Sequence, residues 1–596
     1  MKRFIPAFLP FVTASLFYTN PLFAKVDYQL TISQGEHHLG NVSAEFPSGS
    51  EQLIVKLPSW RTGRYELLDM ANGIRLFSAQ DESGNALNWQ KIDSNSWQIN
   101  TTPNQKVKIS YQVYANELGM RSRHIDDSHA FIDASGFFMF SEAYRDQKVT
   151  VDLNVPTAWR SVSGMENGEH AHQFVADNYD ILVDSPIETG VNKLFKWQVD
   201  DRDYELVLWG EGNYDTDKMI TDLKKLVKTG SDIWHAYPYK RYVFMVHATS
   251  GARGATEHLN STIIQRQRDS FRERDDYIGF ITTASHEFVH TWNVKGYRPQ
   301  GLTPYDYTDH NYTDLLWVAE GSTSYFDDLL LIRGDIITLK EYFKGLSKNI
   351  NKHLARPGRE IQSASETSFD KWINQGGDHD TNFSTNIYSE GALLSWALDV
   401  KLISDSNGNV SYRDVHRALY KDFALPKGFT SGDVKAILKA VSGNDYTAWW
   451  QQNIDSPAAL NFDDMLNTVG LKFDYPKSVS FAASADLNGD YKDGQVFINK
   501  VKREGSAWKA GLTTSDIIVA INGQRISEPF DKYLKRFKPG QSIDISYFRR
   551  DTLHSTKLLL SEKASSPKVI SLVKKPSRKQ KALFKAWLGV DYPKSL

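Results

Sequence analysis

The segment ITTASHEFVHTWNV at residues 281–294 decides how the centre of this chain is interpreted. His286 and His290 lie four positions apart, inside a run of helical periodicity over residues 275–293. Positions four apart share one face of an α-helix, so both imidazoles can reach one metal ion. Glu287 is about 100° round the helix from His286. Its carboxylate can therefore lie beside a metal-bound water and accept its proton without becoming a ligand.

A third ligand is expected downstream, because a catalytic zinc site combines three protein ligands with one open position. The chain contains no cysteine, so the ligands must be histidine or carboxylate. Glu320 lies in an unusually apolar stretch, within a predicted helix that begins near Tyr312. A buried carboxylate needs a cation or a metal, although an exposed helix glutamate is the alternative. The sequence therefore predicts one Zn²⁺ per chain, held by His286, His290 and Glu320.

The first 24 residues resemble a targeting segment. Lys2 and Arg3 precede an apolar stretch that ends at Ala24, a pattern typical of a cleaved signal peptide. A retained membrane anchor is the alternative, and both interpretations place the rest of the chain in the periplasm or outside the cell. Without Lys2 and Arg3, 68 of the 70 basic residues remain against 72 acidic ones, a net charge of −4. This balance gives no indication of nucleic-acid binding.

At 596 residues the chain is too long for one hydrophobic core, so several domains are expected. Short alternating runs predict a β-sandwich-like domain over residues 25–205. Helical periodicity predicts a mainly helical domain over 206–474, and a return to strands predicts a small β module over 475–562. Residues 563–596 read as a basic linker with a short amphipathic C-terminal helix, or as a solvated surface. The predicted fold class is multidomain α+β.

Two long stretches carry a resemblance to a known family. HEFVHTWNVKGYRP at 286–299 and YTDLLWVAEGSTSYFDDLLLIRGD at 312–335 resemble the PDZ-containing glycyl aminopeptidase family, zinc metallopeptidases of the gluzincin type. Residues 57–74 and 253–262 are also similar to this family, as is the order of the domains. The resemblance implies a thermolysin-like catalytic domain over 206–474. It also implies an aminopeptidase that favours small N-terminal residues such as Gly or Ala.

The resemblance assigns further site residues. Gly254, Ala255 and Glu257 belong to a GATEH motif similar to the one with which related aminopeptidases hold the free α-amino group. Glu257 would pair with the ammonium ion, and such a carboxylate at the closed end of a cleft selects a protonated amine. Tyr388 falls where related enzymes stabilise the oxyanion with a Tyr-x-Lys-Gly motif, but Glu390 replaces the usual lysine. An ordinary strand glutamate and a structural tyrosine are the alternatives.

Residues 494–523 resemble the core of a PDZ domain, which binds a peptide as an added strand and holds its carboxylate in a glycine-rich loop. The preceding residues 488–494 lack the usual apolar form of that loop. They also contain Asp490 and Asp493, which would repel a carboxylate. Two roles stay open for this PDZ-like module: capture of peptide C-termini, or packing on the catalytic domain to shape or cover its cleft.

The predicted function is that of a zinc-dependent aminopeptidase acting on peptides with a free N-terminus. Glu287 would be the general base and Tyr388 the stabiliser of the oxyanion. One alternative is a noncatalytic periplasmic peptide-binding protein with structural zinc. The other is a thermolysin-like endopeptidase, for which Glu257 would be incidental. The sequence does not indicate the oligomeric state or the physiological substrate.

Overall fold

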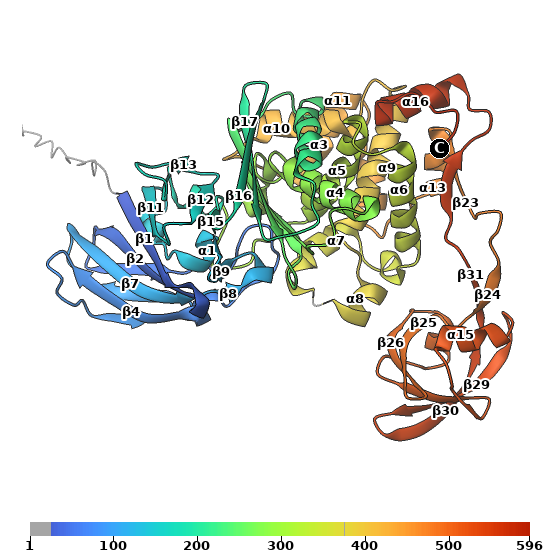
Figure 1. Cartoon of the computed structure of the whole chain (residues 1–596). Coiled ribbons are helices and arrows are strands. Elements are labelled where there is room, and N and C mark those ends of the chain that lie inside the picture. Colours follow the sequence, from blue (N-terminus) through green and yellow to red (C-terminus); the bar gives the residue numbers. More distant parts are fainter. Residues whose placement is uncertain (1–24, 375) are drawn as a thin grey trace, which may run out of the picture.

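The computed structural model describes residues 25–374 and 376–596, so the predicted signal peptide at residues 1–24 lies outside the described residues. Figure 1 shows a β-rich N-terminal domain, a central domain rich in helices, and a C-terminal β module. The predicted multidomain α+β architecture is confirmed for the first two parts. Within the described ranges, no helix is long and apolar enough to cross a membrane.

The N-terminal domain consists of three sheets, with strand orders β13-β14-β11-β1-β2-β7-β4, β12-β15-β10-β9-β8 and β3-β6-β5. Its elements are β1 (Lys25–Gln34), β2 (Leu39–Ser48), β3 (Gln52–Lys56), β4 (Ile74–Asp81), β5 (Trp89–Lys91), β6 (Ser96–Asn100), β7 (Gln105–Tyr114), β8 (Asn116–Glu117), β9 (Arg123–Ile125), β10 (His129–Ile132), α1 (Ala134–Phe137), β11 (Lys148–Asn154), β12 (Arg160–Ser163), β13 (Glu166–Asn167), β14 (Gln173–Ala176), α2 (Tyr179–Val183) and β15 (Ile187–Gly190). Alternate residues of β1, β2 and β7 are buried, as the sequence pattern predicts.

The central domain combines a five-stranded sheet with a bundle of helices. Its elements are β16 (Lys193–Val199), β17 (Arg202–Trp209), α3 (Thr216–Lys228), β18 (Arg241–Ala248), β19 (Gly254–Glu257), β20 (Ser261–Arg266), α4 (Arg274–His290), β21 (Arg298–Pro299), α5 (Ser322–Arg333), α6 (Leu339–Leu354), α7 (Ala364–Phe369), α8 (Gly377–Phe383), α9 (Ser389–Asp405), α10 (Tyr412–Phe423), β22 (Gly428–Phe429), α11 (Ser431–Ser442), α12 (Thr447–Asn453) and α13 (Phe462–Thr468). The sheet order is β16-β17-β18-β20-β19, which leaves β19 at an edge.

The sheet of the central domain extends across the boundary predicted at residue 205. That position lies inside β17, which pairs with β16 on one side and β18 on the other. Helix α4 packs against β19 and β20 and also contacts α5, which in turn packs on α9. The domain is therefore less purely helical than predicted, because a mixed sheet supplies one wall of its core.

The C-terminal part begins and ends beside the central domain. Its elements are β23 (Leu471–Asp474), β24 (Phe481–Ser484), β25 (Leu487–Lys492), β26 (Gln495–Val501), α14 (Ser506–Lys509), β27 (Ile517–Ile521), β28 (Gln524–Arg525), α15 (Phe530–Tyr533), β29 (Ser542–Arg549), β30 (Thr552–Leu559), β31 (Ser561–Ala564), β32 (Val569–Leu572) and α16 (Arg578–Leu588). Strands β23 and β32 pair with each other, as do β24 and β31 (Figure 1). The chain thus leaves the central domain and returns to it through two paired ribbons.

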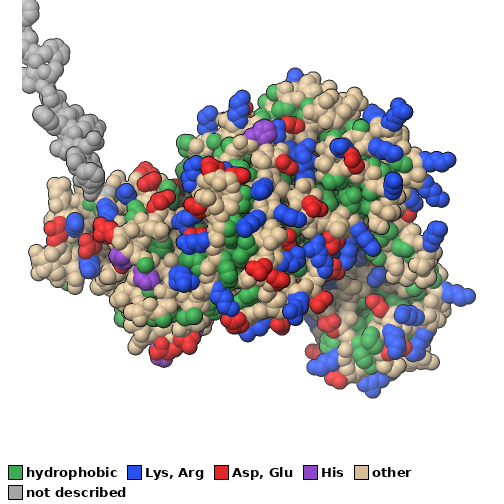
Figure 2. All heavy atoms as spheres, turned by 45° about the horizontal axis from the view of Figure 1, so that its top comes forward, with side chains coloured by type: hydrophobic (Ala, Val, Ile, Leu, Met, Phe, Trp, Pro, Cys, Tyr) green, Lys and Arg blue, Asp and Glu red, His purple; other side chains and the backbone are tan. Residues whose placement is uncertain are grey.

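The small module forms a separate lobe, with a recess between it and the central domain (Figure 2). The two are joined near α8, where the Asn382 side chain donates to the Val501 carbonyl at 2.8 Å and accepts from the Arg503 backbone N–H at 2.8 Å. Residues 488–494 form β25 and its turn into β26, so their backbone is paired in a hairpin. A PDZ identity for the module stays a prediction.

Residues 563–596 are more than a linker with a solvated surface. Leu583, Phe584 and Trp587 of α16 are buried in the core of the central domain. The Trp587 indole N–H donates to the Tyr325 hydroxyl at 3.0 Å. The amphipathic helix predicted at 581–589 therefore completes the central core, because its apolar face has a partner that the sequence alone does not reveal.

Replacing Trp587 by alanine is expected to lower the free energy of unfolding of the central domain by about 3–5 kcal/mol, since it leaves a cavity in that core. Urea unfolding followed by circular dichroism measures the change. Lys581→Ala, on the exposed face of the same helix, is the matched control and should change stability by less than about 0.5 kcal/mol. Equal effects of the two substitutions would contradict the structural role of α16.

Candidate active site

The three predicted metal ligands lie together. His286 and His290 project from the last turns of α4, with their Nε2 atoms 3.1 Å apart. The Oε2 atom of Glu320 lies 3.6 Å from Nε2 of His286 and 3.3 Å from Nε2 of His290. A tetrahedral ion with bonds of about 2.0–2.1 Å requires ligand atoms about 3.3 Å apart. The three side chains therefore fit a single divalent ion without rearrangement.

Each imidazole is oriented through its other nitrogen. Nδ1 of His286 lies 3.1 Å from Oδ2 of Asp327, a residue of α5. Nδ1 of His290 lies 3.0 Å from the carbonyl oxygen of Asn293. Such partners fix the ring orientation and tautomer of metal-binding histidines and raise their basicity as ligands. Both Nε2 atoms are thereby left to face the carboxylate of Glu320.

The carboxylate of Glu320 is held from the opposite side by the N-terminal domain. The Tyr65 hydroxyl donates to Oε1 of Glu320 at 2.6 Å, which leaves Oε2 toward the imidazoles. Burial alone would raise the pKa of Glu320, but the nearby His290 and His286 outweigh it and lower that pKa below its usual value. The group is therefore present as an anion, the form that binds a metal.

A π-helical turn, Trp317–Gly321, places Glu320 directly before α5. Such turns widen a helix locally and are frequent at functional sites. The Asn293 side-chain amide donates to the carbonyls of Val318 at 2.9 Å and Ala319 at 3.1 Å, and to Oγ1 of Thr323 at 3.0 Å. Asn293 therefore joins the end of the helix carrying both histidines to the turn carrying the carboxylate.

Close packing of two glycines brings Tyr388 to the same site. A Cβ on Gly321 would lie 2.3 Å from Cα of Gly391, so the first turn of α9 approaches the π-helical turn closely. Tyr388 immediately precedes α9, and its ring centroid lies 6.3 Å from that of His286. Burial, reinforced by Glu320, raises the pKa of Tyr388 well above its usual value. The phenol therefore keeps its proton and can act as a donor.

The unusual Glu390 has a local explanation. Its Oε2 atom lies 2.5 Å from Nδ1 of His353 on α6, and both side chains are buried. The residue that replaces the usual lysine is thus engaged with a neighbouring helix. The presence of Glu390 instead of lysine leaves Tyr388 directly before α9, beside the predicted metal ligands.

Glu257 ends β19 and is buried beside the predicted metal ligands. Its carboxylate is within 4.8 Å of ligand atoms of both Glu287 and His290. Gly63 of the N-terminal domain has a φ of +79°, and a Cβ there would lie 2.5 Å from Oε2 of Glu257. Only glycine leaves room for this carboxylate. The N-terminal domain therefore closes the cleft beside Glu257.

Glu287 occupies a buried position next to the predicted metal ligands. Burial raises the pKa of Glu287 to about 7, opposed by His286 and His290 and reinforced by Glu257. A carboxylate with a pKa near neutrality can both accept and return a proton, which is what a general base in hydrolysis must do.

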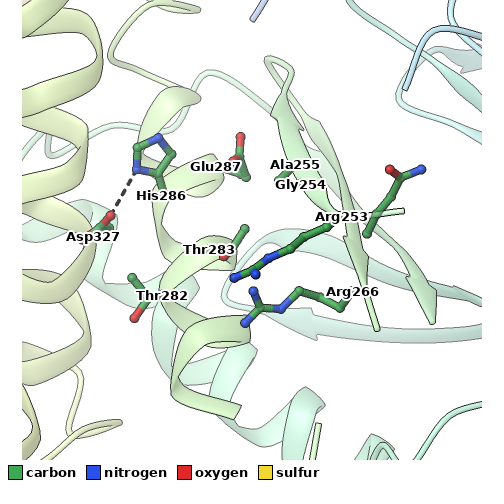
Figure 3. A pocket seen from close by; sticks show the side chains of 10 residues that line it. Arg253, Gly254, Ala255, Arg266, Thr282, Thr283, His286, Glu287 and Asp327 are labelled. Atoms are coloured by element: carbon green, nitrogen blue, oxygen red, sulfur yellow. Dashed lines mark hydrogen bonds and ion pairs between the residues drawn. The ribbon is translucent and has the colours of Figure 1, made fainter. Parts of the chain in front are cut away.

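The site opens into a cavity of about 300 Å³ lined by α4, α5, β19 and β20. Figure 3 shows its lining side chains, among them His286, Glu287 and Asp327 at one side. Gly254 and Ala255, the two predicted substrate-binding residues besides Glu257, line the same cavity. Every site residue predicted from the sequence therefore lies at this cavity or borders the triad beside it.

Sequence reasoning missed three residues that hold the ligands in place. Asp327 lies seven positions after Glu320, a helical spacing that could have identified it. Asn293 is a polar residue three positions after His290, at the end of an apolar helix. Tyr65 lies in the similar stretch 57–74 but 255 positions before Glu320, and no local pattern predicts so distant a contact.

Comparison with known proteins gives two family matches. Residues 27–191 match the family described as Peptidase M61 N-terminal domain, and residues 279–394 match the one described as M61 glycyl aminopeptidase. No curated protein matches the chain in sequence. The two family matches support a peptidase, and the second includes all three predicted metal ligands.

Solved structures are also similar. The crystal structure of an aminopeptidase N family protein from Idiomarina loihiensis has a TM-score of 0.86 and 27% sequence identity, covering 94% of this chain and 100% of that chain. An M1 zinc metallopeptidase mutant from Deinococcus radiodurans bound to a Tyr-Ser-Ala substrate has a TM-score of 0.48 and 14% identity, covering 74% and 95%. Yeast LTA4 hydrolase in complex with bestatin has a TM-score of 0.47 and 15% identity, covering 74% and 68%. The similarity to the Idiomarina structure thus extends over all but a small part of this chain.

Replacing Asn293 by alanine is expected to weaken metal binding by roughly 10- to 100-fold, because the π-helical turn loses the amide that ties it to α4. Competition with a chromogenic chelator measures the affinity. Asn409→Ala, in an exposed loop, is the control. Unchanged affinity in the Asn293 variant would show that the turn holds Glu320 in place without this amide.

Proposed function

We propose that the chain is a zinc-dependent aminopeptidase that removes N-terminal residues from peptides in the periplasm or outside the cell. The observation that carries the proposal is the convergence of His286, His290 and Glu320 within 3.1–3.6 Å of one another. Two imidazoles and one carboxylate around an open position are the donor set of a catalytic zinc site, one ion per chain. The match to M61 glycyl aminopeptidase supports the same reaction class.

Zinc would supply an electrophile that polarises the scissile carbonyl and lowers the pKa of a coordinated water to about 7. Glu287, buried beside the ligands, accepts the proton of the attacking water and passes it to the leaving amine. The phenol of Tyr388, kept protonated by burial, donates to the developing oxyanion. These two residues provide the proton transfer and the charge stabilisation that hydrolysis of a peptide bond requires.

Glu257 distinguishes an aminopeptidase from an endopeptidase in this proposal. Its carboxylate lies within 4.8 Å of Glu287, at the end of the cleft that Gly63 and Tyr65 enclose from the N-terminal domain. A substrate ammonium would pair with it, and a longer N-terminal extension would meet the wall. A preference for Gly or Ala rests on the resemblance and on the glycyl aminopeptidase match.

The leader and the C-terminal module complete the proposal. The basic and apolar pattern of residues 1–24 supports export as a signal peptide. For the PDZ-like module, the negative charges of Asp490 and Asp493 favour packing beside the central domain over capture of peptide C-termini. Contacts of Arg503 with Asn382 and with the Pro357 carbonyl at 3.2 Å support the same role.

Replacing Glu287 by glutamine is expected to lower kcat by a factor of about 10² to 10⁴, because the amide cannot accept the proton of the attacking water. Metal content should stay at the wild-type level, since this residue is not a ligand. Hydrolysis of glycine 4-nitroanilide and metal analysis of the same preparation provide the two measurements. Near-normal turnover would remove Glu287 from the mechanism, and metal binding without any cleavage by the wild type would favour the noncatalytic alternative.

Replacing Glu257 by glutamine is expected to raise KM by about tenfold or more for peptides with a free N-terminus, because a charge-assisted contact with the ammonium is lost. Wild-type enzyme should leave N-acetylated versions of the same peptides uncleaved. Glu273→Gln, an exposed glutamate before α4, is the control. Cleavage of the acetylated peptides at a comparable rate would instead favour an endopeptidase.

A further inference from the structure

The cavity of the candidate active site has a basic end. Arg253 precedes β19 and Arg266 ends β20, and both side chains line the cavity with His286 and Glu287 (Figure 3). The pairing of Gly254 with Gln265 places the two arginines next to each other at this end of the strands. Burial lowers the pKa of Arg266, and the neighbouring Arg253 lowers it further. Two neighbouring positive charges at one end of a cavity attract an anion.

The guanidinium of Arg266 has unused hydrogen-bonding capacity. Its Nη2 atom donates only to the carbonyl oxygen of Asp276, at 3.3 Å. Its Nε atom is buried and has no hydrogen-bond partner within the part of the chain that the structure describes. A planar guanidinium binds a carboxylate through two parallel hydrogen bonds, which would satisfy such a group.

The distance from this basic end to the reacting bond follows from α4. A Cβ on Gly279 would lie 2.5 Å from Nη2 of Arg266, so the guanidinium rests on the helix at that residue. Gly279 and His286 are seven positions apart, which is about 10 Å along a helix. Figure 3 shows Thr283 between Glu287 and the guanidinium groups of the two arginines. The cavity therefore offers an anion site about 10 Å from the predicted metal ligands.

Strand β19 gives a second distance, from Glu257 to the basic end of the cavity. It is the edge strand of its sheet, and its outer side can pair with an extended peptide except at the Arg253 carbonyl, which accepts from Arg121 at 3.1 Å. A peptide whose ammonium lies at Glu257 and whose chain proceeds toward Arg253 runs antiparallel to β19. The four steps along the chain from Arg253 to Glu257 span about 13 Å, or about four residues of extended peptide.

We propose that Arg253 and Arg266 bind the C-terminal carboxylate of the substrate, so that the enzyme acts on free peptides of about three to five residues. The inference rests on the proposed aminopeptidase function. The site then matches a short zwitterion, with Glu257 beside Glu287 and His290 at one end and the two arginines of the cavity lining at the other. A longer peptide carries its carboxylate beyond the cavity and loses this contact.

The test compares Gly-Ala-Ala-Ala with its C-terminal amide, which removes only the negative charge. Wild-type enzyme should have a kcat/KM at least about tenfold higher for the free acid, mainly through KM. Arg253→Gln and Arg266→Gln should each reduce that ratio toward one, while hydrolysis of the amide and of glycine 4-nitroanilide stays unchanged. Arg272→Gln, an exposed arginine outside the cavity lining, should keep the wild-type ratio. For an eight-residue peptide, acid and amide should be cleaved equally.

Each remaining outcome overturns the inference. Equal rates for acid and amide in the wild type, or a ratio that survives both arginine substitutions, would show that the arginines do not bind the carboxylate. In either case, continued hydrolysis of glycine 4-nitroanilide would leave the proposed aminopeptidase function intact. Absence of hydrolysis of all substrates by the wild type would overturn the proposed function and this inference with it.

Discussion

The site depends on the hydrogen bonds that one buried amide makes between two helices. Asn293 lies just beyond α4, where its backbone carbonyl faces His290, and its side chain binds two carbonyls of the π-helical turn before α5. Without that junction, Glu320 would be positioned only indirectly, through Tyr65 and through the contact of Asp327 with His286, because the ligands come from separate helices. Asn293 is buried, so water cannot take the place of its amide, and loss of the amide would remove a donor from both carbonyls. The π-helical turn is the backbone form that this arrangement stabilises.

The N-terminal domain contributes directly to the cleft as well as covering it. Arg61 and Arg121 both donate to Oγ1 of Thr256, at 3.0 and 3.1 Å, and Arg121 also donates to the Arg253 carbonyl. These bonds hold β19, an edge strand that would otherwise be free on one side. Burial lowers the pKa of Arg61 to about 10, which leaves it cationic at neutral pH. The strand along which a substrate would lie is thus positioned by a different domain from the one that carries the metal ligands.

The sequence predicts the local parts of this arrangement and misses the distant ones. The helical spacing of His286 and His290 requires only that α4 be a helix, and its observed bounds agree with the predicted run of residues 275–293 to within three positions. The π-helical turn at Glu320 could not be predicted, because its hydrogen bonds involve Asn293, outside its own segment. The domain boundary predicted at residue 205 falls inside β17. Periodicity identifies a strand but does not indicate which sheet the strand joins. The burial of α16 was missed for the same reason, since its apolar face gives no information about its partner.

The charges around the candidate active site give an electrostatic reason why a substrate would need a free N-terminal amine. Glu257, Glu287 and Glu320 place three carboxylates around one small site, while Asp327 and Arg121 nearby add one charge of each sign. A divalent ion would offset two of the three negative charges, and the ammonium of a substrate would offset the third. A peptide with a blocked N-terminus would leave one carboxylate uncompensated in a site with little water, where an unpaired charge is costly. The same carboxylate that would select the amine is thus also neutralised by it.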